Sequence, residues 1–292
     1  MASGNEVARY RAEMANLLEK SIATTCELER WLDVTGSLRE VMVQFDLASD
    51  PTGTIRIMCA LLLRKARLHT DAVLRANETN NVHSLAVQMR PVLECAGQVV
   101  FIFHNLMIAP DLTIARERAA DLVGGYLNAD YYRTIIGATK GKVGHKALLE
   151  KIAEAEEAAA ASFGMPTPQR KGKSLKQADK VATLVEGNSW YDYLSEYFCH
   201  GRADWRGHSW RGGVVSVDMV QDEFTFAGLM DYLVKQVAFM NAYAALCPIV
   251  GDDGRGWVEA TLEQLRDARE TSMAVRDAAV AALSNADTAA ED

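Results

Sequence analysis

The segment from Asn81 to Ile108 is apolar on almost every side when it is placed on a helical wheel. A helix of that kind has to be covered all round, so the segment predicts a central helix with others packed around it. Five polar residues nevertheless fall in one narrow stripe, at spacings of seven, four, four and seven: His83, Arg90, Glu94, Gln98 and Asn105. Because charged side chains are rarely buried in a core, the stripe indicates either polar ties between helices or a functional site.

Arg90 and Glu94 stand four residues apart and can form an ion pair on one face of that helix. Pro91 lies between them and is expected to kink the helix or to mark its true start, because proline has no backbone N–H. Desolvation largely offsets the attraction within a buried ion pair, so stability alone does not explain the pair.

Helical periodicity also dominates the rest of the chain, and the alternation typical of strands is nearly absent. With 292 residues, 49% of them hydrophobic and 24% charged, the chain has the size and composition of a folded globular protein. We predict an all-α fold, a single bundle of about eight or nine helices with a Gly/Trp/Arg-rich loop. The bundle domain is expected over residues 1–250, and a C-terminal helix with a frayed acidic tail over residues 251–292. The helices are expected near residues 5–32, 51–77, 81–108, 111–136, 145–163, 174–185, 188–200, 222–246 and from 257 onward, with one extended piece at 214–220.

Charge and cysteine usage narrow the class of protein. Thirty-one basic and 39 acidic side chains leave a net charge of −8, which repels nucleic acid on average. Five scattered cysteines without a C-x-x-C motif argue against a zinc ribbon and a disulfide framework. Neither a secretion signal nor a membrane span is recognisable, so we expect a cytoplasmic protein without membrane contacts. No metal-binding motif occurs, and neither a metal nor a cofactor is expected. Long amphipathic terminal helices favour a homodimer.

A second polar cluster lies between Trp190 and His200. Asp192, Glu196 and His200 follow one another at four-residue spacing, which places them on one face of a helix. A carboxylate one turn before a histidine can orient its ring or raise its pKa, and this suits a general acid or base.

The loop from Gly201 to Gly213 interleaves arginine, histidine and tryptophan with glycine, a composition typical of a phosphate- or base-binding surface. Its candidate residues are Arg202, Trp205, Arg206, His208, Trp210 and Arg211. Residues 165–211 hold eight basic and five acidic side chains, so this segment carries +3 and the remainder −11. We therefore expect RNA or another anionic ligand at residues 165–211. The alternative is a loop packed by its two tryptophans with the arginines in water.

Two short motifs resemble a widespread bacterial family of all-helical proteins whose activity is not established. The segment from His83 to Glu94 resembles that family's R-P-x-L-E helix. The segment from Tyr191 to His200 resembles its later Y-x-x-L-S-x-x-x-H helix, with one extra residue before the histidine. The resemblance covers about residues 55–246. It implies that five matching residues meet in space: Arg90, Glu94, Tyr191, Ser195 and His200.

A looser resemblance is to HEPN-type helical ribonucleases of toxin and defence systems, whose signature is an arginine followed four to six residues later by a histidine. Arg202 and His208, with five residues between them, match this spacing. The resemblance implies a dimer in which two Arg/His pairs form one composite site. The histidine would act as acid or base, and the arginine would stabilise the charge on the phosphorane.

These patterns lead to three hypotheses about function. The first is an RNA-directed, HEPN-like nuclease or other metal-independent hydrolase of host defence, acting through the Arg/His pair of the loop. The second is a small-molecule-binding protein or enzyme with a pocket built from Arg90, Glu94, Tyr191 and His200. The third is a structural assembly protein in which the polar stripe only fixes the register of the helices.

The nuclease hypothesis predicts that the purified protein cuts single-stranded RNA in the presence of a chelator. His208→Ala is expected to abolish the cutting, because the histidine would carry the proton in the reaction. RNA binding should also weaken steeply with added salt if residues 165–211 contact phosphates. Gel analysis of the products measures the cleavage, and cutting that survives the substitution contradicts the hypothesis.

Overall fold

The structure is a computed structural model of the whole chain. It describes residues 2–32, 51–107, 113–114, 117–119, 122, 154, 181–184, 186–199, 210–211, 214–215, 223–246 and 255–291.

The described residues are mainly helical, which confirms the predicted all-α bundle. The helices are α1 (Ala2–Leu32), α3 (Pro51–Glu78), α4 (Val82–Met107), α8 (Gly187–Leu194), the π-helix η1 (Ser195–Cys199), α10 (Glu223–Leu246) and α11 (Arg255–Glu291). Two short strands, β1 (Trp210–Arg211) and β2 (Val214–Val215), pair antiparallel with Trp210 opposite Val215. Seven helices lie in the described residues, so the predicted total of eight or nine and the Gly/Trp/Arg-rich loop stay predictions.

Several predicted helix boundaries agree with the structure to within a few residues. Asn81 accepts a 2.9 Å hydrogen bond from the backbone N–H of Ser84, as expected of the residue that caps α4. Pro91 lies inside α4, so the alternative that it marks the start of this helix is wrong. The helices expected at 111–136, 145–163 and 174–185 fall mainly outside the described residues.

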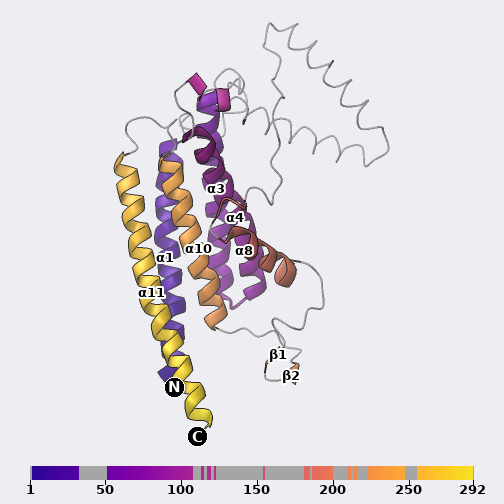
Figure 1. Cartoon of the computed structure of the whole chain (residues 1–292), viewed down its shortest axis with the longest axis vertical. Helices are drawn as coiled ribbons and strands as arrows, with labels where there is room; N and C mark the ends of the chain where they lie inside the picture. Colours follow the sequence, from indigo (N-terminus) through magenta and orange to yellow (C-terminus); the bar gives the residue numbers. More distant parts are fainter. Residues whose placement is uncertain are drawn as a thin grey trace. The chain divides into compact units, whose positions relative to one another are not determined.

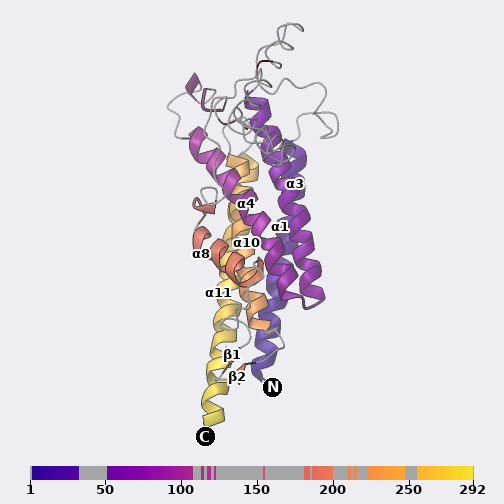
Figure 2. The ribbon, with the colours of Figure 1, turned by 90° about the vertical axis from the view of Figure 1, so that its right-hand side faces the viewer.

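The chain divides into two compact units. Unit 1 consists of residues 1–32, 59–103 and 177–292, and unit 2 of residues 33–58 and 104–176. Within unit 1, α11 packs along α1 and α10, as Figure 1 and Figure 2 show. The predicted domain boundary at residue 250 stays a prediction. All contacts discussed below lie within unit 1.

Two helices form the centre of unit 1. α4, which the sequence predicts as the central helix, is buried along most of residues 82–102. The buried side chains of α10 likewise fall on every side of that helix. Tyr243 of α10 contacts Phe103 of α4, with 4.8 Å between the ring centroids. The core therefore contains a second largely buried helix beside the predicted one.

A buried carboxylate connects α1, α10 and α11. Asp231 of α10 is only 6% exposed, and its oxygens accept hydrogen bonds from Tyr10 of α1 at 3.0 Å and from Ser272 of α11. Lys235, one turn further along α10, lies 2.9 Å from the same carboxylate. Because an unpaired charge is costly in a core, these donors have to stay in place for the three helices to pack.

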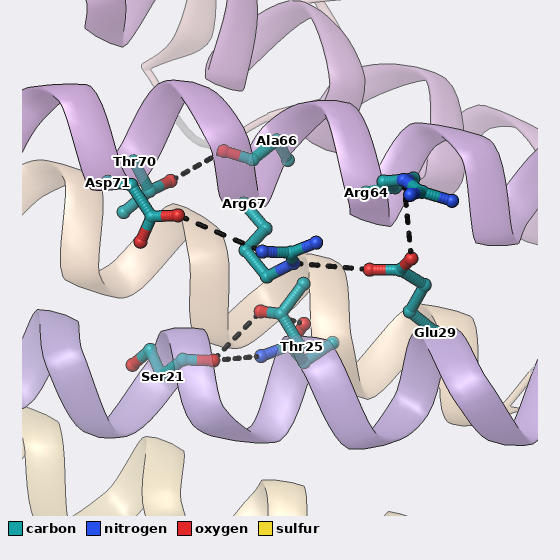
Figure 3. Close-up of polar contacts among 9 residues, drawn as sticks. Ser21, Thr25, Glu29, Arg64, Ala66, Arg67, Thr70 and Asp71 are labelled. Carbon is teal, nitrogen blue, oxygen red and sulfur yellow. Dashed lines mark hydrogen bonds and ion pairs between the residues drawn. The ribbon is translucent and has the colours of Figure 1, made fainter.

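A second polar contact joins α3 to α1 (Figure 3). The Nε atoms of Arg64 and Arg67 lie 3.7 Å and 3.2 Å from the carboxylate oxygens of Glu29. Arg67 also lies 3.8 Å from Asp71 on the next turn of α3. Glu29 is buried, and the two arginines compensate its charge within the interface between α1 and α3. This contact places α3 along α1.

Among the described residues, one helical stretch, Val82–His104, is long and apolar enough to cross a membrane by length and composition alone. Of the most apolar 18-residue window in this stretch, 61% is buried inside the molecule. A core helix of a soluble protein can have the same length and apolar composition. The stretch is weak evidence for a membrane span, and the predicted absence of membrane contacts stays a prediction.

Tyr10→Phe is expected to lower the free energy of unfolding by about 1.5–3 kcal/mol, because it removes a hydrogen bond to a buried charged group. Urea unfolding near neutral pH measures this loss.

The same variant tests a pH dependence. Burial is the main cause that raises the pKa of Tyr10, and the negative charge of Asp231 is the second. As the pH rises, the unfolded chain therefore loses this proton before the folded protein does. The contribution of Tyr10 to stability is therefore complete below a pH of about 10 and is lost as the pH rises further. Stability should fall less steeply above this pH in the variant than in the wild type, and equal slopes contradict the role of Tyr10.

Candidate functional site

Three residues of the polar stripe of α4, His83, Arg90 and Glu94, contact the segment that contains α8 and η1, named here the covering segment. The side chain of Asn105 lies outside the described residues. The contacts, in order along α4, are His83 with Phe198, Arg90 and Glu94 with Tyr191, and Gly97 with Thr183. Residue numbers rise on α4 as they fall on the covering segment, so the two run antiparallel. This part of the stripe therefore lies at a contact between two segments.

Arg90, Glu94 and Tyr191 contact one another, and the three are named here the Arg90 cluster. The guanidinium of Arg90 donates a hydrogen bond to the Tyr191 hydroxyl, which donates in turn to Glu94 Oε1 at 3.1 Å. Arg90 Nε lies 3.6 Å from the same Glu94 oxygen. Arg90 Cζ also lies 4.4 Å from the centroid of the Tyr191 ring, a cation–π contact. The structure thus brings together three of the predicted site residues, from α4 and α8.

The members of the Arg90 cluster differ in their access to solvent. The side chain of Arg90 is 30% exposed and that of Glu94 16% exposed, whereas Tyr191 is buried. Burial raises the pKa of Tyr191, and the hydrogen bond from Arg90 acts in the opposite direction. A tyrosine is protonated near neutral pH even at its ordinary pKa, so the phenol is a proton donor rather than a base. The cluster therefore offers a permanent positive charge and a neutral hydroxyl donor beside one carboxylate.

Ser195 acts on the Arg90 cluster through the backbone. It is buried, and its hydroxyl donates to the carbonyl oxygen of Tyr191 at 2.7 Å. The helix changes from α to π at this residue. A π-helix bonds residue i to i+5 instead of i+4 and so takes one more residue in a turn. The extra residue that separates Ser195 from His200 in the sequence motif coincides with this change.

Stacked aromatic rings also join the covering segment to α10. Trp190 of α8 stacks on Tyr232 of α10, with ring centroids 4.4 Å apart and planes at 15°. Within the segment, Tyr193 makes edge-to-face contacts with Trp190 and with Phe198, with 5.8 Å between the ring centroids in each pair. The contacts of Trp190, Tyr232 and Thr183 in this region were not predicted from the sequence. Helical periodicity assigns faces to each helix, but it does not say which faces meet.

The start of α8 depends on a glycine. Glu186 adopts a left-handed backbone conformation with φ 57°, and the chain turns back so closely that Gly187 lies against the preceding turn. A Cβ at Gly187 would lie 2.0 Å from the carbonyl oxygen of Val181 and 2.8 Å from Cβ of Leu184. Only glycine fits there without movement of the backbone, and this turn sets the position of Tyr191 four residues later.

The remaining predicted site residues lie wholly or partly outside the described part of the chain. They are His200, Arg202, Trp205, Arg206 and His208, which are not described, and Trp210 and Arg211, which are described only as the backbone of β1. The meeting of His200 with the Arg90 cluster and the Arg202/His208 pair of the nuclease hypothesis therefore stay predictions. The described residues contain no group of three or more His, Cys, Asp and Glu that could hold a metal ion.

Comparison of the chain with family models, with curated proteins and with solved structures finds no match. The two family resemblances in the sequence stay predictions.

Gly187→Ala is expected to lower the free energy of unfolding by about 1–3 kcal/mol, because the added methyl group collides with backbone. Gly228→Ala is the matched control, since a Cβ at Gly228 meets nothing within 4 Å. The control should be neutral or stabilising by up to about 1 kcal/mol, because alanine favours a helix over glycine. Urea unfolding compares the two, and a Gly187→Ala protein as stable as its control contradicts the steric argument.

Proposed function

We propose that the protein binds a small anionic molecule at the Arg90 cluster, as a binding protein or as an enzyme that acts on this molecule. The observation that carries the proposal is the position of Arg90. Its guanidinium is held by Glu94 and the Tyr191 ring, while 30% of the side chain is exposed to solvent. A guanidinium held in one orientation binds carboxylate or phosphate well, because its planar fork matches two oxygens of the ligand.

Tyr191 supports this role. Its hydroxyl donates to Glu94, and like any tyrosine hydroxyl it keeps its proton near neutral pH. A ligand oxygen that approached Arg90 would compete with Glu94 for this hydroxyl and for the guanidinium.

The competing explanation is that the Arg90 cluster only ties α8 to α4. The two explanations differ in what they predict for Glu94. In a binding site, the Glu94 carboxylate repels an incoming anion and occupies its donors, so its neutralisation favours binding. In a purely structural tie, neutralisation weakens the contact between the helices and has no effect specific to anions.

The test is the rise in melting temperature with inorganic phosphate, compared with sodium chloride at equal ionic strength. Wild-type protein should be stabilised by phosphate beyond the effect of the chloride, since a ligand that binds only the folded state raises its stability. Arg90→Met should weaken phosphate binding at least about tenfold, which corresponds to ~1.4 kcal/mol. Glu94→Gln should strengthen it.

Arg64→Met is the matched control, because Arg64 is also partly exposed and paired with a glutamate, 3.7 Å away. It should leave the response to phosphate unchanged. An identical response in the wild type, Arg90→Met and Glu94→Gln overturns the proposal and leaves the cluster as a structural tie.

A further inference from the structure

The Arg90 cluster holds one positive and one negative charge. The guanidinium of Arg90 and the carboxylate of Glu94 lie side by side on α4, with 3.6 Å between Nε and Oε1. Tyr191 adds a neutral hydroxyl donor, and the charges that act on its pKa are those of Arg90 and Glu94. The cluster as a whole is therefore electrically neutral.

A ligand that is only negative disturbs this balance. The side chain of Glu94 is 16% exposed, and its Oε1 accepts from the Tyr191 hydroxyl and lies beside Arg90. An anion that takes these donors removes two partners of Glu94 and adds a second negative charge next to its carboxylate. Because a partly buried charge needs a partner of opposite sign, Glu94 opposes the binding of such a ligand.

A ligand that also carries an ammonium group avoids this cost. Its ammonium would replace Arg90 and Tyr191 as the partner of Glu94, while its carboxylate accepts from the guanidinium and from the hydroxyl. Each charge then has a partner of opposite sign, and the net charge of the site stays zero. Hydrogen bonds that involve charged groups are also about twice as strong as neutral ones, and this ligand makes them through both of its groups.

The spacing of Arg90 and Glu94 limits the spacing of the charges on the ligand. The two residues are one turn apart on α4, and their side chains approach to 3.6 Å. The ligand therefore needs its ammonium and carboxylate close together rather than at opposite ends of a chain. An α-amino acid has this arrangement, because a single carbon atom joins its ammonium nitrogen to its carboxylate.

We propose that the ligand of the Arg90 cluster is a free α-amino acid, with its carboxylate bound by Arg90 and Tyr191 and its ammonium bound by Glu94. This inference rests on the proposed function, in which Arg90 anchors an anionic group, and it specifies the class of molecule that carries this group. Glu94 attracts the ammonium of an amino acid and repels carboxylates and phosphates without one. Repulsion of the wrong ligand is a general source of specificity.

Thermal melting with matched pairs of ligands tests this assignment. Wild-type protein is screened against the common L-amino acids, each beside the carboxylic acid that lacks its ammonium group, such as alanine beside propionate. At least one amino acid should raise the melting temperature, and its matched acid should bind at least about tenfold more weakly, since it brings no partner for Glu94. 6-Aminohexanoate, whose charges lie far apart, should bind no better than the matched acids.

Glu94→Gln should have opposite effects on the two kinds of ligand. It should weaken binding of the amino acid at least about tenfold, because a neutral amide does not attract the ammonium, and it should strengthen binding of inorganic phosphate. The gain for phosphate verifies that the variant is folded. Glu78→Gln is the control, because it makes the same substitution at an exposed position at the end of α3, and it should change neither affinity.

The outcomes separate this inference from the proposed function. If phosphate binds through Arg90 but no amino acid binds better than its matched acid, the assignment of an amino acid is overturned and the proposed function stands. Amino-acid binding that survives Glu94→Gln or Arg90→Met undiminished also overturns the assignment. If neither phosphate nor any amino acid raises the melting temperature, both proposals fail.

Discussion

Asp231 is a buried charge on a helix that other helices surround, and unit 1 depends on its neutralisation. The donors come from three elements: Tyr10 from α1, Ser272 from α11 and Lys235 from α10 itself. A shift of one helix along another by a single turn would separate a donor from the carboxylate and leave charge uncompensated in the core. Apolar side chains supply most of the attraction between these helices but tolerate several registers. The polar contact therefore selects one register among those that hydrophobic burial alone would allow.

The central position of α4 and its polar stripe could be predicted, because a helix that is apolar all round has to be buried and its few polar residues then need partners. Tyr191 was identified as one partner through a sequence motif. The stacking of Trp190 on Tyr232 could not be foreseen, since α10 is apolar on all sides and offers no periodic signal for one contact face. Asp231 was missed for a related reason: one acidic residue in a helix resembles a surface position until the neighbouring helices are placed. The π-helix differs from an α-helix by one residue, which is within the error of any assignment by periodicity.

Two kinds of interaction hold α8 in place, and they have different chemical consequences. The contact with α10 is between stacked aromatic rings and needs only shape and apolar area. The contact of Tyr191 with α4 consists of two hydrogen bonds and a cation–π contact, and a ligand with suitable oxygens can replace the hydrogen bonds one by one. A binding site at the α4 side is therefore compatible with a segment that stays anchored by its rings on the α10 side. The turn at Glu186 and Gly187 adds a steric restraint on where this segment begins.

The covering segment is short, with eight residues in α8 followed by five in η1. Helices of this length do not persist alone in water, so this segment is helical only while it rests on α4 and α10. Its backbone amides should therefore exchange with solvent through local opening, at a lower free energy than those of α1 or α10. Each such opening separates Tyr191 from Arg90 and dismantles the Arg90 cluster. The cluster and the folding of this small segment are thus a single equilibrium, and any molecule that needs Tyr191 to bind also slows hydrogen exchange along α8.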